Sequence, residues 1–158
     1  MTSDFVEMLS ALSAAGVRFI VVGAHALAVH GAPRATGDLD IWVSPARDNA
    51  DRTLQALAAF GAPLFDLSAE DLTRPDTVFQ MGVPPSRIDI LAGITGVSFD
   101  DAWPRRVIVT VAGLEVPVLS KQDFVTNKRL VDRPKDRADL ALLEEAEGGS
   151  STGSQVKD

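Results

Sequence analysis

Apolar residues recur at two different spacings along the chain, and these spacings predict its helices and strands. Apolar residues at every third or fourth position predict helices over about 4–15, 24–30, 49–60, 120–131 and 134–147. Short apolar runs bounded by glycine or proline predict strands over 18–22, 38–43, 77–81, 87–91, 107–111 and 114–119. A single helical turn is expected over 99–103. We therefore expect an α/β (α+β) fold, in which helices flank a small mixed β-sheet and two C-terminal helices end the domain.

Two strand assignments also predict a position in the sheet. The strands over 77–81 and 87–91 are joined by a glycine- and proline-rich segment, 82–85, which predicts a hairpin beside the first two strands. The strand over 114–119 contains Pro117, which has no N–H to donate to a neighbouring strand. We therefore expect this strand at an edge of the sheet.

The length of 158 residues and the 46% share of apolar residues fit one folded domain with a sizeable core. We place this domain at residues 1–147, because 148–158 lacks apolar periodicity and is expected to be a disordered tail. The chain has no cysteine, which excludes disulfides, thiolate zinc sites and cysteine nucleophiles. No apolar run approaches membrane-spanning length and no secretory leader is recognisable, so we expect a soluble, cytoplasmic protein with no membrane partner.

An Asp-apolar-Asp triplet is the main chemical signal in the sequence. Side chains alternate across a strand, so Asp38 and Asp40 share one face while Leu39 and Ile41 enter the core. Asp89 lies between two isoleucines on a later strand. If the two strands are neighbours, three carboxylates converge, and divalent cations such as Mg²⁺ are needed to offset their repulsion. This pattern favours metal-assisted phosphoryl or nucleotidyl transfer, and the alternative is that the acids decorate the solvent face of an open sheet.

A glycine turn precedes this triplet. The strand over 18–22 ends at Gly23 and a helix follows at once, an order that presents backbone N–H groups to a phosphate. A glycine required only for a sharp turn is the alternative explanation. In combination, the turn and the acidic strand predict a nucleotide site with bound metal.

The charge of the chain is unevenly distributed. The net charge is −7, which argues against general attraction to nucleic acid. Residues 121–137 nevertheless carry a local net charge of +3, which leaves −10 on the remainder. This basic segment is either a phosphate-contacting surface or a solvated helical face and loop.

These motifs resemble the nucleotidyltransferase superfamily of the DNA polymerase β type, in particular its small bacterial members related to toxin–antitoxin nucleotidyltransferases. The resemblance covers about residues 5–145 and implies the nucleotidyltransferase fold. Four blocks carry it: Val22-Gly23-Ala24, Gly31-Ala32-Pro33-Arg34-Ala35-Thr36-Gly37-Asp38-Leu39-Asp40-Ile41, Arg87-Ile88-Asp89-Ile90-Leu91, and Asn127-Lys128-Arg129 followed by Arg133-Pro134-Lys135-Asp136-Arg137-Ala138-Asp139-Leu140.

The resemblance implies a role for each acidic residue and for the glycine turn. Asp38 and Asp40 would ligate two Mg²⁺ ions, and Asp89 would complete the metal site and help to deprotonate an acceptor hydroxyl. Gly23 and Ala24 would hold the phosphates of an NTP such as ATP. Attack at the α-phosphate would then release pyrophosphate.

Further residues would complete the nucleotide site. Lys128 would approach the β- or γ-phosphate, while Arg34, Arg133 or Lys135 would add positive charge. Thr36 would bind the nucleotide or steady the loop before the metal strand, and a plain surface role is the alternative for both Arg34 and Thr36.

Ala24 departs from the family pattern, which often has serine or a second glycine at this position. Alanine keeps the backbone N–H but has no hydroxyl, and a positive φ there would cost about 1–2 kcal/mol. The sequence therefore leaves two functions open. The first is a Mg²⁺-dependent nucleotidyltransferase that transfers NMP from an NTP to a hydroxyl of RNA, protein or a small molecule. The second is a non-catalytic nucleotide-binding or interaction module, such as an antitoxin-like partner.

Overall fold

The computed structural model describes the backbone of residues 1–157 and the side chains of residues 1–148. Its strands are β1 (Phe19–Val22), β2 (Asp38–Val43), β3 (Val78–Met81), β4 (Arg87–Leu91), β5 (Val107–Val111) and β6 (Leu114–Val118). Its helices are α1 (Ser3–Ala14), α2 (Gly23–Val29), α3 (Arg47–Phe60), α4 (Phe99–Ala102), α5 (Lys121–Val131) and α6 (Pro134–Lys157), with short 3₁₀ turns η1 (Asp71–Thr73) and η2 (Trp103–Arg105). Each helix and strand predicted from the apolar spacing is present.

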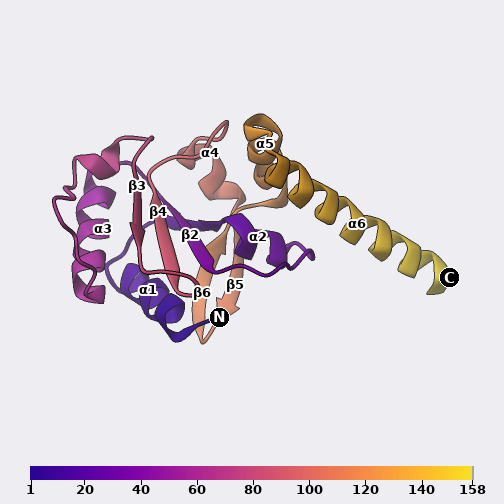
Figure 1. Cartoon of the computed structure of the whole chain (residues 1–158), viewed down its shortest axis with the longest axis horizontal. Helices are drawn as coiled ribbons and strands as arrows, with labels where there is room; N and C mark the ends of the chain where they lie inside the picture. Colours follow the sequence, from indigo (N-terminus) through magenta and orange to yellow (C-terminus); the bar gives the residue numbers. More distant parts are fainter. Residues whose placement is uncertain (158) are drawn as a thin grey trace.

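The strands form one mixed sheet in the order β3-β4-β2-β1-β6-β5. β2 lies antiparallel to β1 and parallel to β4, and β6 is parallel to β1. The predicted hairpin of β3 and β4 is antiparallel and extends the sheet beside β2. Helices flank this sheet (Figure 1). The fold class expected from the sequence is therefore confirmed.

The core forms where β2 turns its apolar side chains away from the acidic ones. Leu39 and Ile41 are fully buried, whereas Asp38 and Asp40 on the opposite face remain partly exposed. Helices α1 and α3 pack against each other and contact the sheet. Each fully buried leucine or isoleucine contributes about 1.5–3 kcal/mol, so this core holds the acidic strand rigidly in place.

One strand lies in a different position from the one predicted. The edge of the sheet is β5, and β6 lies inside it between β1 and β5. Pro117 is tolerated there because β6 pairs with β1 only at Val118, one residue beyond the proline. The N–H of Leu119 then donates to the Val21 carbonyl at 3.0 Å. Pro117 itself lies opposite Ile108 of β5.

The C-terminal helices begin as the sequence predicted. Ser120 caps α5 by accepting from the Asp123 N–H at 3.1 Å, and α6 starts at Pro134, where the absent N–H costs no hydrogen bond. In Figure 1, α6 extends away from the body of the protein and its backbone continues to Lys157. The sequence predicted a disordered tail over 148–158. Side chains from 149 on lie outside the described residues, so the disorder of this tail stays a prediction. None of the described helices has the length and apolar character to cross a membrane.

Candidate nucleotide and metal site

The acidic side chains lie together on two neighbouring strands. In the parallel pairing of β2 with β4, Asp40 lies directly opposite Asp89, and Asp38 lies directly opposite Arg87. Residues opposite each other in a parallel pair point to the same face of the sheet. The proximity of these strands, which was a condition of the sequence argument, is thus confirmed.

The glycine turn lies directly against this carboxylate pair. Val22, the last residue of β1, is paired with Asp40, so the chain reverses beside the Asp40 side chain. Gly23 has φ +68°, a conformation that favours glycine. A Cβ atom on Gly23 would overlap Asp40 Oδ2, well inside contact distance. Gly23 is therefore required both by the backbone and by the closeness of the carboxylate.

Asp40 carries the clearest electrostatic signature of the site. Burial, followed by the negative charge and the side-chain hydrogen bond of Asp89 and the charge of Asp38, raises the pKa of Asp40 to about 6, while Lys135 opposes the shift. Carboxylates crowded in this way favour either a shared proton or a cation. The crowding fits a divalent-ion site with hard oxygen ligands.

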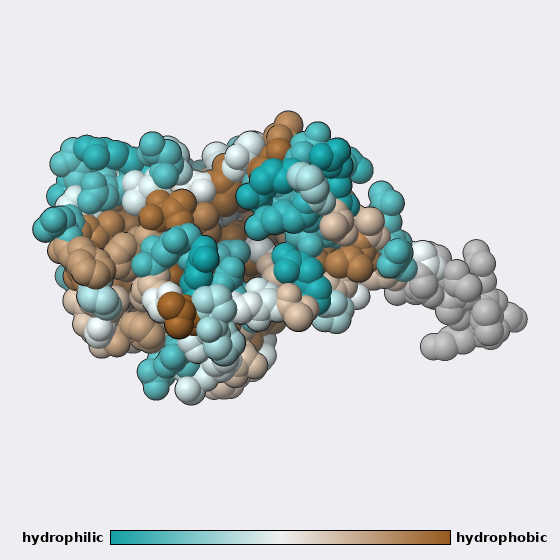
Figure 2. All heavy atoms as spheres, in the orientation of Figure 1, coloured by the Kyte–Doolittle hydropathy of each residue, from teal (hydrophilic) through white to brown (hydrophobic). Residues whose placement is uncertain are grey.

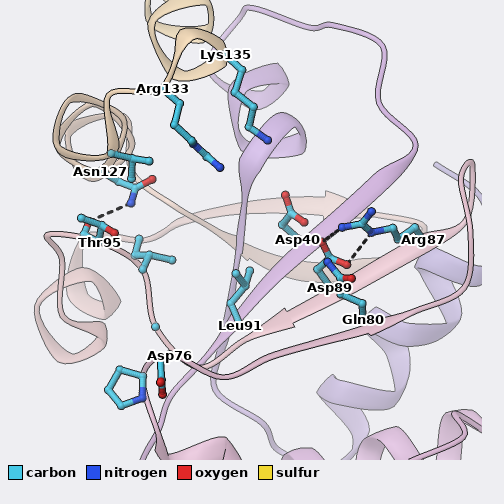
Figure 3. A pocket seen from close by; sticks show the side chains of 14 residues that line it. Asp40, Asp76, Gln80, Arg87, Asp89, Leu91, Thr95, Asn127, Arg133 and Lys135 are labelled. Atoms are coloured by element: carbon cyan, nitrogen blue, oxygen red, sulfur yellow. Dashed lines mark hydrogen bonds and ion pairs between the residues drawn. The ribbon is translucent and has the colours of Figure 1, made fainter.

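Arg87 binds two of the three carboxylates. Its Nε and Nη2 donate to Asp89 Oδ1 and Oδ2 at 3.0 and 3.1 Å (Figure 3). The same Nε lies 3.8 Å from Asp38 Oδ1. Within residues 1–148, no group of three or more acidic, histidine or cysteine side chains is arranged to hold a metal ion. The register of β2 and β4 brings Asp38, Asp40 and Asp89 to one face of the sheet, where Arg87 engages Asp89. Strand alternation already places Arg87 beside Asp89, although this pairing did not enter the sequence prediction.

Two clefts meet at Asp40. The smaller cleft has a volume of about 380 Å³ and lies beside the glycine turn; its lining includes Gly23, Ala24, Arg34, Thr36, Asp38 and Lys128. The larger cleft has a volume of about 660 Å³ and lies on the Asp89 side; its lining includes Asp76, Gln80, Arg87, Asp89, Thr95 and Asn127. Both clefts also share Arg133 and Lys135. Figure 3 shows these two cations reaching from α6 and the segment before it toward the acidic strands.

Buried aspartates of α6 hold the cations of the smaller cleft in place. Asp139 accepts from Arg34 Nε at 2.8 Å and lies 3.4 Å from Lys128 Nζ. Asp136 accepts from Lys128 Nζ at 3.1 Å and from Arg133 Nε at 2.7 Å. Both aspartates are almost completely inaccessible to solvent. The sequence alone predicted no role for these aspartates, because Arg34 lies far from them along the chain.

The remaining predicted residues have defined positions. The Thr36 hydroxyl accepts from the Asp38 N–H at 3.1 Å, which fixes the start of the acidic strand. Ala24 lies inside α2 and has no positive φ, so the strain considered for this position does not arise. Its missing hydroxyl remains the departure from the family pattern.

The basic residues of segment 121–137 are partly buried in ion pairs and partly exposed at the clefts. Lys128 is buried with its aspartates, whereas Arg133 and Lys135 are exposed at both clefts. Figure 2 shows hydrophilic residues gathered over α5 and the start of α6 on the visible face. Part of the predicted basic surface is thus directed at the carboxylate site.

Comparisons with known proteins agree with this architecture. No family model and no curated protein sequence matches the chain. Among solved structures, the fold is similar to that of a "putative nucleotidyltransferase" from Thermotoga maritima, with 16% sequence identity and a TM-score of 0.52. The match covers 96% of this chain and 91% of that protein. At this identity the likeness concerns the fold alone: the chain has a nucleotidyltransferase fold over almost its whole length.

Proposed function

We propose that this protein is a Mg²⁺-dependent nucleotidyltransferase, which transfers NMP from an NTP to a hydroxyl group and releases pyrophosphate. The observation that carries the proposal is the meeting of two clefts at paired carboxylates: one cleft is rich in cations, and the other is open beside Asp89. A donor and an acceptor could then reach the same carboxylates from opposite sides. RNA, a protein or a small molecule would supply the acceptor hydroxyl.

The smaller cleft is suited to the donor triphosphate. Arg34, Lys128, Arg133 and Lys135 supply positive charge on one side, and the backbone of Gly23 and Ala24 lines the other. Asp136 and Asp139 fix three of these cations before any ligand arrives, so little side-chain entropy is lost on binding. This arrangement supports the nucleotide-binding role predicted for Gly23, Ala24, Arg34, Thr36 and Lys128.

Asp38, Asp40 and Asp89 would hold the two Mg²⁺ ions after Arg87 releases Asp89, because the three side chains do not form a metal-binding group while that contact is present. The fit rests on their oxygen-only donor set, the crowding that raises the pKa of Asp40, and the closeness of the glycine turn to that carboxylate. When bound, the ions would supply charge stabilisation for the attacking and leaving oxygens of an in-line displacement.

The proposed transfer forms one bond to the α-phosphorus, breaks another, and moves one proton. The acceptor oxygen forms a bond to the α-phosphorus, and the bond from that phosphorus to the oxygen bridging to the β-phosphate breaks. Asp89, which lines the larger cleft, would take the proton of the acceptor hydroxyl after Arg87 has released it. Pyrophosphate leaves from the cation-lined smaller cleft.

Transfer of label from α-³²P-labelled NTPs tests this function. Each NTP is incubated with Mg²⁺, total RNA and a protein extract, with wild type, Asp38→Asn/Asp40→Asn, and the exposed, equally charged control Asp66→Asn/Asp100→Asn. We expect label in RNA or protein with wild type and the control, and none with the site variant. Transfer that survives in the site variant would contradict the proposal.

A non-catalytic nucleotide-binding module is the second candidate. The absence of a hydroxyl at Ala24 and the engagement of Asp89 by Arg87 favour it. Such a module, for example an antitoxin-like partner, would bind NTP and leave every label untransferred. Binding measured in parallel with the transfer assay separates the two functions.

A further inference from the structure

Arg87 occupies a central position among the acidic side chains. It lies opposite Asp38 in the register of β2 and β4, and its guanidinium forms a two-point contact with Asp89 at 3.0 and 3.1 Å. The same Nε atom lies 3.8 Å from Asp38 Oδ1. One positive charge thus links the first and the third carboxylate of the site.

This contact uses the same oxygen atoms that a cation would require. Both oxygens of Asp89 accept from Arg87, and only about 10% of the Asp89 side chain is exposed. A guanidinium in a two-point contact engages one lone pair on each carboxylate oxygen and places a positive charge beside both. A divalent ion at the same oxygens would be repelled by that charge, so the two cations compete for Asp89.

The larger cleft can accommodate the Arg87 guanidinium after it leaves Asp89. Arg87 lines this cleft beside Gln80, and about a third of its side chain is already exposed. Rotation of the side chain into the cleft would expose the charged group to water, which reduces the cost of breaking the contact.

We infer that Arg87 is an internal counter-ion of the carboxylate site, which holds Asp38 and Asp89 together without a divalent ion and is displaced from Asp89 when one binds. This inference rests on the proposed metal-dependent function. Arg87 is therefore a positioning residue that lowers the affinity for divalent ions, because each binding event must break its contact with Asp89. The same contact stabilises the fold while the site holds no ion, since three crowded carboxylates repel one another.

Mn²⁺ binding, followed by electron paramagnetic resonance, tests this inference directly. We compare wild type, Arg87→Gln, Arg87→Lys and Asp38→Asn/Asp40→Asn. We expect Arg87→Gln to bind Mn²⁺ on the order of tenfold more tightly than wild type, with Arg87→Lys between them, because a positive charge at contact distance is removed or moved. Arg105→Gln is the matched control, because Arg105 makes a similar two-point contact with the buried Asp123 at 3.0 and 2.9 Å. It should leave Mn²⁺ affinity unchanged.

Thermal unfolding supplies a second readout that does not depend on activity. In EDTA, Arg87→Gln should unfold at a lower temperature than wild type, and Mn²⁺ should raise its midpoint by more than it raises that of wild type. Arg87→Gln that binds Mn²⁺ no more tightly than wild type, while Asp38→Asn/Asp40→Asn abolishes binding, would overturn the counter-ion role alone. No Mn²⁺ binding by any variant would overturn the metal-dependent function together with it.

Discussion

At the scale of single residues, the site depends on Asp40 and on the glycine that touches it. The two strands and the turn bring Asp40 against Asp89 on one side and Gly23 on the other. This crowding keeps the Asp40 carboxylate protonated at a higher pH than an ordinary aspartate. Both neighbours can be tested by substitution.

The raised pKa of Asp40 predicts a stability difference that depends on pH. Because the folded pKa of about 6 lies above the ordinary aspartate value of 3.8, the folded protein keeps a proton that the unfolded chain has lost, and wild type loses stability as pH rises from about 4 to about 6. Asp40→Asn cannot ionise, so in EDTA it should gain stability relative to wild type between about pH 4 and about pH 6, by roughly 4–8 °C in the midpoint. Thermal scans of both proteins at several pH values measure this. A difference that is constant or shrinks with rising pH would contradict the assignment.

The closeness of Gly23 to Asp40 predicts a specific defect in Gly23→Ala. The added methyl group would meet Asp40 Oδ2, and the positive φ adds about 1–2 kcal/mol of backbone strain. Mg²⁺-dependent NTP binding should weaken by on the order of tenfold. Gly113→Ala is the control, because Gly113 has φ +81° but no neighbouring atom within 4 Å of the place that a Cβ would occupy. Gly113→Ala should lose only the stability that the positive φ costs and should keep its NTP affinity. Equal losses of NTP affinity in both variants would refute the contact of Gly23 with Asp40.

At the scale of elements, α6 is connected to the acidic strand through buried ion pairs. Asp139 of α6 holds Arg34, which precedes β2, and both Asp139 and Asp136 hold Lys128 of α5. The helices and the loop before β2 thereby form one wall of the smaller cleft. Their relative positions determine where the cations lie.

Removal of one buried partner should destabilise this wall. Asp139→Asn leaves Arg34 without its carboxylate and weakens the pairing of Lys128, which should lower the free energy of unfolding by about 2–3 kcal/mol. Asp132→Asn is the matched control, because its contact with Arg137 at 3.5 Å is exposed to solvent. It should change stability by less than about 0.5 kcal/mol. Urea unfolding measures the free energy of unfolding of both variants. Equal losses would show that the buried ion pairs stabilise the fold no more than the exposed pair does.

The elements and the acidic face could be predicted from sequence, because strand alternation and apolar spacing are local signals. Leu39 and Ile41 fix which face of β2 enters the core, and therefore where Asp38 and Asp40 point. The pair of Arg34 with Asp139 spans 105 positions, and no local pattern marks it. The interior position of β6 was not predicted either. It depends on β6 pairing with β1 only at Val118, one residue beyond Pro117, and no local pattern marks that register.

At the scale of the whole molecule, a domain of 1–147 should hold all of the site and the core. Its buried residues and both clefts lie within this range. A protein shortened to residues 1–147 should keep the thermal midpoint of the full chain within about 1 °C, since the removed segment lacks apolar periodicity. Calorimetry of the two proteins measures this. A marked loss of stability would move the domain boundary toward the C-terminus.

In the proposed function, Asp38, Asp40 and Asp89 bind an NTP through divalent cations beside the glycine turn. Calorimetric titration of each NTP into the protein, with Mg²⁺ and with EDTA, tests it without knowledge of the acceptor. We expect heat of binding for wild type only when Mg²⁺ is present, and none for Asp38→Asn/Asp40→Asn under either condition. NTP binding that is equal with and without Mg²⁺, or that persists in the double variant, would contradict the claim.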